Sequence, residues 1–242
     1  MNISAIVLAA GKGTRMGSDK PKVLHEIGGR PMIEYTIEKL EQLGVLEIIL
    51  VVGHGASEVK ACIDPKCHYA HQENPLGTGD AVKVGLQEVN DVSDTVMVLY
   101  GDDSAFYKVE TLKAFLAFHI NSGNLISDIT ADKPQTENVG RVIRDKDGNF
   151  KEIMEVWEYK ESGLHSDEVN CGVYLFNKEW LKKNIGKIKN ENEKKEYRIT
   201  DVLNMADKSV KIGLFKLEDP SEWVGVNTPE ELVKANKLME AA

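Results

Sequence analysis

Three continuous apolar runs in the first half of the chain, each followed by a glycine, constrain the fold more than any other feature. They cover residues 3–10, 48–52 and 96–100. Continuous apolar character, in place of strict alternation, is typical of strands buried on both faces of a parallel sheet. The runs therefore predict a parallel sheet whose strands end in glycine-containing loops.

Helical patterns separate these predicted strands and follow the last one. They cover residues 31–43, 57–63, 80–89 and 109–121. Gly44 and Gly123 follow the first and last of these patterns, at the position where helices commonly stop. The alternation of strands and helices predicts an α/β fold with three layers, built on a central sheet.

After about residue 124 the pattern changes to shorter pieces. Strand-like segments cover residues 126–131, 140–144, 150–156, 168–176 and 210–217, and helical segments cover 180–188, 200–206 and 229–239. Thr228 is a suitable cap for the last helix. The charged stretch at 187–195 is expected to be a solvated loop. We expect these pieces to extend or flank the first sheet.

Charge limits the partners of this chain of 242 residues. It has 30 Lys and Arg against 39 Asp and Glu, a net charge of −9. General electrostatic attraction to nucleic acid or to an anionic membrane is therefore not expected. Any anionic ligand must be held by a local site.

The cysteines and histidines argue against a metal site built from these residue types. Cys62, Cys67 and Cys171 are an odd set without a CxxC pair, which indicates small buried thiols and a reducing compartment. The six histidines are not spaced as metal ligands are. There is no basic segment of a secretory signal at the start, and no apolar run approaches the ~20 residues of a membrane span. We expect a cytoplasmic protein.

A glycine-rich loop after the first predicted strand is the leading candidate for an anion site. Gly11, Gly13 and Gly17 have the spacing G-x-G-x-x-x-G, which differs from the dinucleotide fingerprint by one residue and lacks the lysine of a Walker A loop. Residues 1–30 carry five basic and two acidic side chains, a local charge of +3. Glycine backbone N–H groups and nearby cations can together hold more than one phosphate.

The residues of this loop resemble a known signature. Leu8-Ala-Ala-Gly-Lys-Gly-Thr-Arg-Met16, followed by Lys20-Pro-Lys22, is similar to the L-x-x-G-x-G-T-R-(x)n-P-K signature of sugar-1-phosphate nucleotidyltransferases. Further segments resemble this family in the same order: Val51 to Gly55, Leu76 to Ala81, Tyr100 to Asp102, Gly140-Arg141, Glu155, Asn170 to Gly172, Tyr197 to Asp201 and Gly225 to Asn227. The chain looks most like the uridylyltransferase domains of bacterial UDP-N-acetylglucosamine pyrophosphorylases.

The resemblance implies a role for each matching residue. It implies that Arg15, Lys22 and Asp102 are catalytic, and that Asp102 and Asn227 hold Mg²⁺ against substrate phosphates. It implies nucleotide binding by Leu8, Ala9, Ala10, Gly11, Gly13, Gln72, Gly77, Thr78, Tyr100 and Gly101, and sugar binding by Gly140, Glu155 and Asn170. If the strand pleat persists, Asp103 points away from Asp102 and takes no part in metal binding.

The implied fold is a single Rossmann-like nucleotidyltransferase domain over residues 1–242, with a mixed, mainly parallel central sheet. About residues 1–124 would bind the nucleotide, and a small β-rich part over about 125–242 would bind the sugar and close the site. The implied reaction joins a nucleoside triphosphate to a sugar 1-phosphate and releases pyrophosphate. UTP and N-acetylglucosamine 1-phosphate, or a related hexose 1-phosphate, are the expected substrates.

Other interpretations stay open. A cytidylyltransferase that acts on a non-sugar phosphate such as phosphocholine would use the same loop, and a nucleotide-sensing domain would bind without turnover. Asp103-Ser104 replaces the small residue and proline usual in the family, and Val156 to Tyr159 replaces a shorter, more polar pattern. Pro75 stands where uridylyl enzymes often have a polar residue. These departures leave open which nucleotide base and which sugar the protein binds. The oligomeric state is not predicted.

Overall fold

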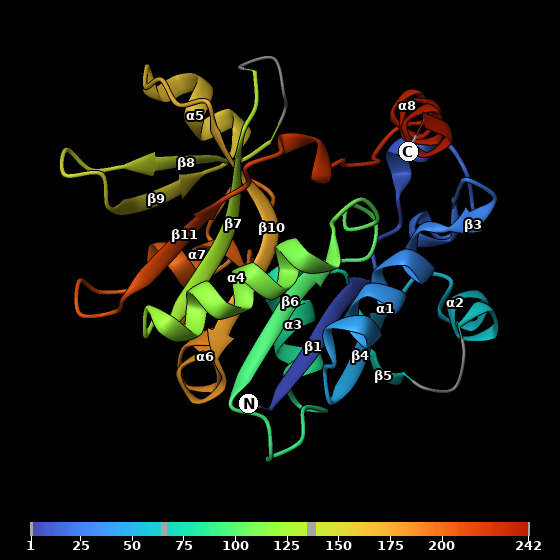
Figure 1. The fold of residues 1–242 in the computed structure, drawn as a ribbon, viewed down its shortest axis with the longest axis horizontal. Helices are drawn as coiled ribbons and strands as arrows, with labels where there is room; N and C mark the ends of the chain where they lie inside the picture. The colour runs from blue at the N-terminus through green and yellow to red at the C-terminus, as the bar shows by residue number, and fades with distance from the viewer. Residues whose placement is uncertain (1, 64–66, 135–138, 242) are drawn as a thin grey trace.

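The computed structural model describes residues 2–63, 67–134 and 139–241, which form a mixed sheet between two layers of helices (Figure 1). Strand β1 (Ile3–Ala9) lies at the centre and pairs in parallel with β4 (Glu47–Val52) and β6 (Thr95–Tyr100). Strand β5 (His68–His71) continues this parallel part beyond β4. The carboxyl ends of these strands therefore meet at one edge of the sheet.

The second half of the chain extends the same sheet on the side of β6. Strand β10 (Glu168–Asn177) runs antiparallel between β6 and β7 (Ile126–Asp132), and β11 (Ile212–Lys216) pairs in parallel with β7. Strands β8 (Arg141–Arg144) and β9 (Phe150–Met154) form a hairpin that pairs with β10. The main path has the order β11-β7-β10-β6-β1-β4-β5. The prediction of a mixed, mainly parallel sheet is confirmed.

Helices bury the two faces of the sheet. The layer on one face contains α1 (Met32–Leu43), α2 (Ala56–Cys62) and α4 (Val109–Asn121), and the layer on the other contains α3 (Thr78–Leu86), α6 (Lys178–Asn184) and α7 (Thr200–Asn204). Strand β1 is buried along its whole length because alternate residues enter the two cores. This explains why its sequence is apolar throughout.

The remaining segments of the described structure are seven short ones and the longer C-terminal helix. They are η1 (Thr14–Met16), η2 (Lys22–Leu24), β2 (Glu26–Ile27), β3 (Arg30–Pro31), α5 (Val156–Ser162), η3 (Ile185–Lys187), η4 (Pro220–Glu222) and α8 (Pro229–Ala241). A third apolar cluster joins Ala235 of α8 to Met16, Ile27 and Met32. The C-terminal helix is thereby packed against the N-terminal loops.

Two expectations about local structure are wrong. The strand expected over 150–156 ends at Met154, because Glu155 and Glu158 form a capping box that starts helix α5. Strand β5 was not predicted, since it has only four residues and its first and last are exposed histidines, so it shows no apolar run. No described helix is long and apolar enough to cross a membrane.

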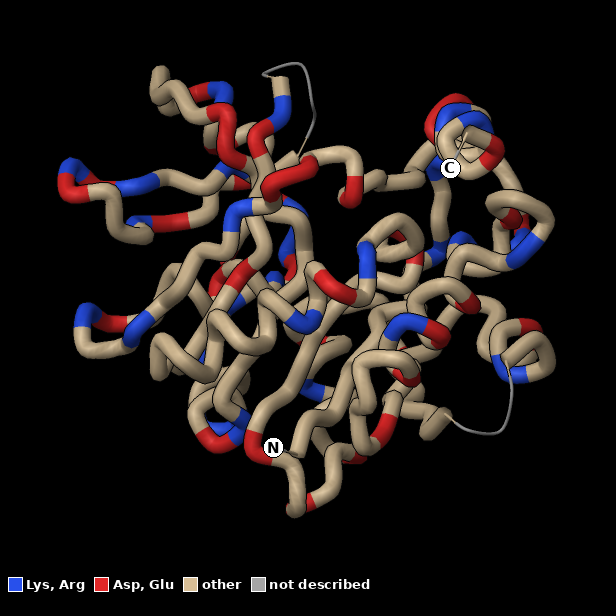
Figure 2. Tube along the Cα trace, in the orientation of Figure 1, with Lys and Arg blue, Asp and Glu red and all other residues tan. Residues whose placement is uncertain are grey.

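The cysteines also differ in part from expectation. Cys67 and Cys171 are buried and Cys62 is exposed, and all three are free thiols. Cys62 is the last residue of α2, where the helix face turns outward. Basic and acidic residues are interspersed along the described trace (Figure 2).

Candidate active site

The candidate site lies where β1 and β6 end side by side. Gly101 N donates to Leu8 O at 3.0 Å, which holds the two strand ends together. Gly13 has a left-handed conformation with φ of 60°, and a Cβ atom there would lie 2.9 Å from Lys22 Cβ. Glycine at position 13 therefore lets the loop fold closely over the Lys22 side chain.

Four side chains from distant segments meet at this edge: Arg15, Lys22, Asp102 and Asn227. Lys22 Nζ forms an ion pair with Asp102 Oδ2 and donates a hydrogen bond to Asn227 Oδ1 at 2.7 Å. Arg15 Nη2 donates to the same oxygen at 2.8 Å. The Lys22 and Asp102 side chains are only 14% and 15% exposed, so their interaction is less screened than a surface pair.

Asn227 is held in this position by the start of α8. Its backbone N–H donates to Glu231 Oε2 at 2.6 Å, and Thr228 Oγ1 accepts from Glu231 N at 3.2 Å. The predicted cap at Thr228 is therefore present. Because α8 packs against the N-terminal loops, Asn227 lies within hydrogen-bond distance of Arg15 and Lys22.

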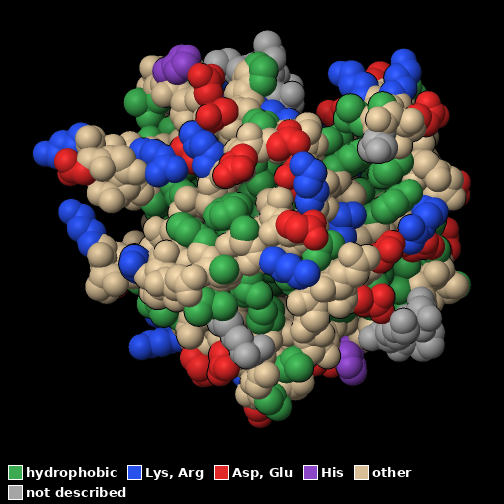
Figure 3. Space-filling view, in the orientation of Figure 1, with side chains coloured by type: hydrophobic (Ala, Val, Ile, Leu, Met, Phe, Trp, Pro, Cys, Tyr) green, Lys and Arg blue, Asp and Glu red, His purple; other side chains and the backbone are tan. Residues whose placement is uncertain are grey.

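These four residues line a cavity of about 790 Å³. The space-filling view shows a notch between α8 and the part of the molecule that carries β8, β9 and α5 (Figure 3), and residues of both sides line the cavity. The other residues named from the sequence that line it are Thr78, Tyr100, Gly140, Glu155 and Asn170. A volume of this size can hold a ligand as large as a nucleotide or a sugar phosphate.

Glu155 and Asn170 have fixed orientations in the cavity. Glu155 Oε1 accepts from Thr200 Oγ1 at 3.3 Å, and burial raises the pKa of Glu155 although Arg198 opposes the shift. Asn170 Oδ1 accepts from Gly172 N at 3.0 Å, and its Nδ2 donates to Tyr174 Oη at 2.7 Å. One N–H and one oxygen lone pair of Asn170 remain for a ligand.

A β-bulge between Asn170 and Tyr174 creates this arrangement. Gly172 within it has φ of +73°, and a Cβ atom there would lie 2.5 Å from Tyr100 Cε2. Glycine is therefore required for β10 to approach the Tyr100 ring. The resemblance drew attention to Gly172 as part of its Asn170 motif, and the structure supplies the steric reason.

The other residues predicted to bind the nucleotide are not among the described residues that line the cavity. They are Leu8, Ala9, Ala10, Gly11, Gly13, Gln72, Gly77 and Gly101. Leu8 and Ala9 are buried within β1. Gln72 Nε2 donates to Gly77 O at 3.1 Å and to Asp80 Oδ2 at 2.8 Å. These bonds use both N–H groups of the Gln72 amide, and the residue is only 7% exposed.

The expectation that Asp103 points away from Asp102 is wrong, because both residues line the cavity. Strand β6 ends at Tyr100, and residues 101–103 form a turn, so the alternation of a strand no longer applies. Burial, followed by the charge of Asp102, raises the pKa of Asp103.

Several residues that line the cavity were not identified from the sequence. They include Lys133, Trp157, Lys194, Arg198 and Trp223. Lys194 lies 5.2 Å and Arg198 Cζ 5.7 Å from the ring centroid of Trp157, so the stretch expected to be only a solvated loop contributes to the site. Trp157 and Trp223 each lie within a few residues of a motif residue, Glu155 or Asn227, and that proximity was the available signal.

The residues present fit a small divalent cation. Asp102 and Asn227 offer a carboxylate and an amide oxygen, and the ammonium group of Lys22 already contacts both as a positively charged stand-in. Mg²⁺ commonly takes only one or two protein ligands and completes its shell with water and substrate phosphate. No described group of three or more His, Cys, Asp or Glu side chains could hold a metal by itself.

Comparison with known proteins agrees with this geometry. The chain is 38% identical to the bifunctional protein GlmU of Clostridioides difficile over 240 residues, which are 99% of this chain and 52% of that protein. It is also 38% identical to GlmU of Lactobacillus johnsonii, over 99% of this chain and 52% of that protein. The chain thus spans about half the length of these curated relatives.

The fold is shared with solved enzymes. A UDP-glucose pyrophosphorylase complexed with UDP-glucose superposes with a TM-score of 0.83 and 18% identity, covering 100% of this chain and 99% of the other. A family model described as nucleotidyl transferase matches residues 4–242. The chain belongs to the nucleotidyl transferase family.

Proposed function

We propose that this protein transfers a nucleotidyl group from UTP to N-acetylglucosamine 1-phosphate or a related hexose 1-phosphate, with Mg²⁺. The observation that carries the proposal is the meeting of Arg15, Lys22, Asp102 and Asn227 in one cavity with Glu155 and Asn170. Cations suit the phosphates, and a carboxylate with an amide suits sugar hydroxyls or an N-acetyl group. GlmU relatives and a structurally similar UDP-glucose enzyme support the same substrate classes.

In this proposal an oxygen of the sugar phosphate attacks the α-phosphorus of the triphosphate, and pyrophosphate leaves. Two anions must approach each other, so the protein's task is to orient them and to neutralise charge on the nonbridging oxygens. Arg15 and Lys22 are suited to this task because both reach the same point, Asn227 Oδ1, from separate segments. Glu155 and Asn170 would orient the sugar.

Asp102 and Asn227 would hold the Mg²⁺, which supplies positive charge that offsets repulsion between the two substrates. The ammonium group of Lys22 occupies the space between these oxygens in the structure. Lys22 must therefore exchange Asp102 for a phosphate oxygen when substrates bind. Such an exchange keeps every charge paired at each stage.

The test is pyrophosphate release by the full chain across UTP, dTTP, CTP, GTP and ATP, each with several sugar 1-phosphates and with phosphocholine. We expect turnover with UTP and a hexose 1-phosphate. Asp102→Asn should lower turnover by a few orders of magnitude and leave the fold intact, because an amide binds Mg²⁺ less strongly than a carboxylate.

Asp132→Asn is the matched control, since Asp132 pairs with Lys216 on the exposed end of β7 and does not line the cavity. It should retain wild-type turnover. Strict preference for CTP with phosphocholine would contradict the assigned substrates. Nucleotide binding without pyrophosphate release in any combination would contradict the enzymatic function.

A further inference from the structure

The cavity contains a polar pair to which the proposed reaction assigns no role: the carboxylate of Asp103 and the indole N–H of Trp223. Both residues line the cavity. Trp223 is only 7% exposed, and its Nε1 atom makes no hydrogen bond of ordinary geometry with the described residues, although it interacts with the Asp103 carboxyl group. A buried donor without a partner is costly and uncommon in native proteins. The indole N–H therefore lacks a well-aligned acceptor, and a ligand group placed between it and Asp103 can supply one.

The Asp103 carboxylate offers the complementary group. Its Oδ1 atom lies 3.3 Å from Ser104 Oγ, whose hydroxyl also donates to Tyr100 O. Its Oδ2 atom lies 3.6 Å from the point that a Cβ atom on Gly172 would occupy, so it faces a residue without a side chain. This oxygen is an acceptor beside the bulge that carries Asn170.

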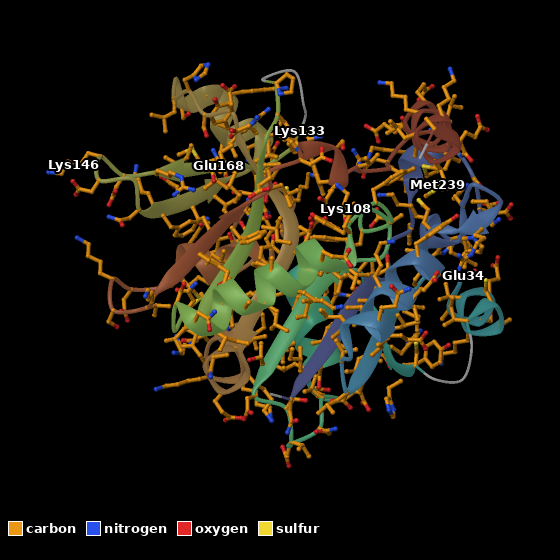
Figure 4. All side chains as sticks on the ribbon, in the orientation of Figure 1. Glu34, Lys108, Lys133, Lys146, Glu168 and Met239 are labelled. Carbon is orange, nitrogen blue, oxygen red and sulfur yellow. The ribbon has the colours of Figure 1, made fainter. Side chains whose placement is uncertain are left out.

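The two groups lie close to each other. Burial and the charge of Asp102 raise the pKa of Asp103, while the charge of Lys22 and hydrogen bonding from the Trp223 indole lower it, so the indole N–H is within reach of the carboxyl group. The indole is also fixed in place: Lys133 Nζ donates to Trp223 O at 3.3 Å and lies 5.5 Å from the ring centroid. Figure 4 labels Lys133 at the end of β7, beside the segment that carries Trp223.

We propose that Asp103 and Trp223 together recognise one hydroxyl group of the sugar 1-phosphate and so determine which acceptor the enzyme uses. A hydroxyl donates one proton and accepts another, which matches a carboxylate oxygen beside an indole N–H. A fully ionised phosphate could not donate to the Asp103 carboxyl group, and an ammonium group could not accept from the indole. The inference rests on the proposed function and adds a specificity-determining pair to it.

The experiment compares monodeoxy analogues of whichever sugar 1-phosphate the wild-type protein uses. Removal of one particular hydroxyl should lower kcat/KM by about 10- to 100-fold, because both protein groups lose their partner. In Trp223→Phe, which keeps the ring and loses the N–H, the same removal should cost less than about 3-fold. Asp103→Asn should reduce the penalty in the same way, and KM for the nucleotide should stay unchanged in both variants.

Trp157→Phe is the matched control, since it removes an indole N–H from another residue that lines the same cavity. The penalty for losing the selected hydroxyl should remain at its wild-type value in this variant. Thermal melting of every variant verifies folding. Suppose that the wild-type protein turns over but that removing the hydroxyl lowers kcat/KM by the same factor in every variant. This result would contradict recognition of the hydroxyl by Asp103 and Trp223. No turnover by the wild-type protein with any substrate pair would overturn the proposed function, and the pair with it.

Discussion

Arg15 and Lys22 share one acceptor, the Oδ1 atom of Asn227, at 2.8 and 2.7 Å. Two cations directed at one oxygen form a ready-made site for an anion of higher charge, such as a triphosphate. The planar guanidinium of Arg15 can also bind two phosphate oxygens at once, which an ammonium group cannot do. The geometry of Arg15 therefore matters in addition to its charge.

Arg15→Lys tests this at the residue scale. The variant keeps the charge and loses the bidentate donor, so transition-state stabilisation should fall by about 1–3 kcal/mol. This corresponds to a loss of kcat/KM of roughly one to two orders of magnitude. Steady-state kinetics at two ionic strengths provide the measurement. A mild decrease that fades as the salt concentration rises would instead mean that Arg15 only contributes positive potential.

The buried carboxyl group of Asp128 makes the stability of the protein depend on pH. It is fully buried in β7, and neither carboxylate oxygen has a hydrogen-bond partner among the described residues. Burial raises the pKa of Asp128, and the charge of Glu168 adds to the shift. The folded protein thus keeps Asp128 protonated at pH values where the unfolded chain has released the proton.

Stability from Asp128 is therefore present below the ordinary aspartate pKa of about 3.9 and is lost as pH rises toward the folded-state pKa. An amide cannot ionise. We expect the free energy of unfolding of Asp128→Asn, relative to the wild type, to increase as pH rises from about 4 to 7. Urea unfolding at several pH values measures it. A difference that is constant with pH would show that Asp128 ionises equally in both states.

At the scale of elements, helix α8 links stability to the site. Its first turn holds Asn227 through Glu231, and Thr228 caps it. Ala235 packs into the cluster that contains Met16 of the glycine-rich loop. The position of Asn227 therefore depends on how this helix begins and on the face that it buries.

Thr228→Ala should lower the free energy of unfolding by about 1 kcal/mol, because one N-terminal backbone N–H of α8 loses its acceptor. It should also weaken activation by Mg²⁺, since Glu231 then holds Asn227 less rigidly. Chemical denaturation and the magnesium dependence of turnover measure the two effects. Thr228→Ser restores the hydroxyl and should rescue both. Failure of Thr228→Ser to rescue them would show that the methyl group of Thr228 is what matters.

At the scale of the whole molecule, the cavity is built from both halves of the chain. Arg15 and Asp102 come from the first half of the chain and Glu155 and Asn227 from the second, so a ligand that fills the cavity would contact both halves. The domain parts at about 1–124 and 125–242 are, in our proposal, the nucleotide and sugar halves of one site. A ligand that joins them stabilises the native state by mass action.

A nucleotide sugar product at about 100 times its Kd should add about 2.7 kcal/mol of stability. For a chain of this size, that corresponds to a rise in Tm of roughly 5–10 °C. Thermal melts over a range of ligand concentrations, with and without Mg²⁺, measure the shift. An unchanged Tm at millimolar UDP-sugar, together with unchanged Tm at millimolar UTP, would contradict binding in this cavity.

Local patterns in the sequence predicted most strands, most helices and the loop after β1, because apolar periodicity, glycines and caps act over a few residues. The family motifs also predicted that Asp102 and Asn227 belong to one site, and both line the same cavity. Only the tertiary structure decided that Lys22 lies between their oxygens, that Asp103 turns into the cavity and that Trp223 lies beside it. These placements depend on where a strand stops and on how a helix more than a hundred residues away packs. No local pattern specifies such long-range contacts, because they arise from the topology of the folded chain.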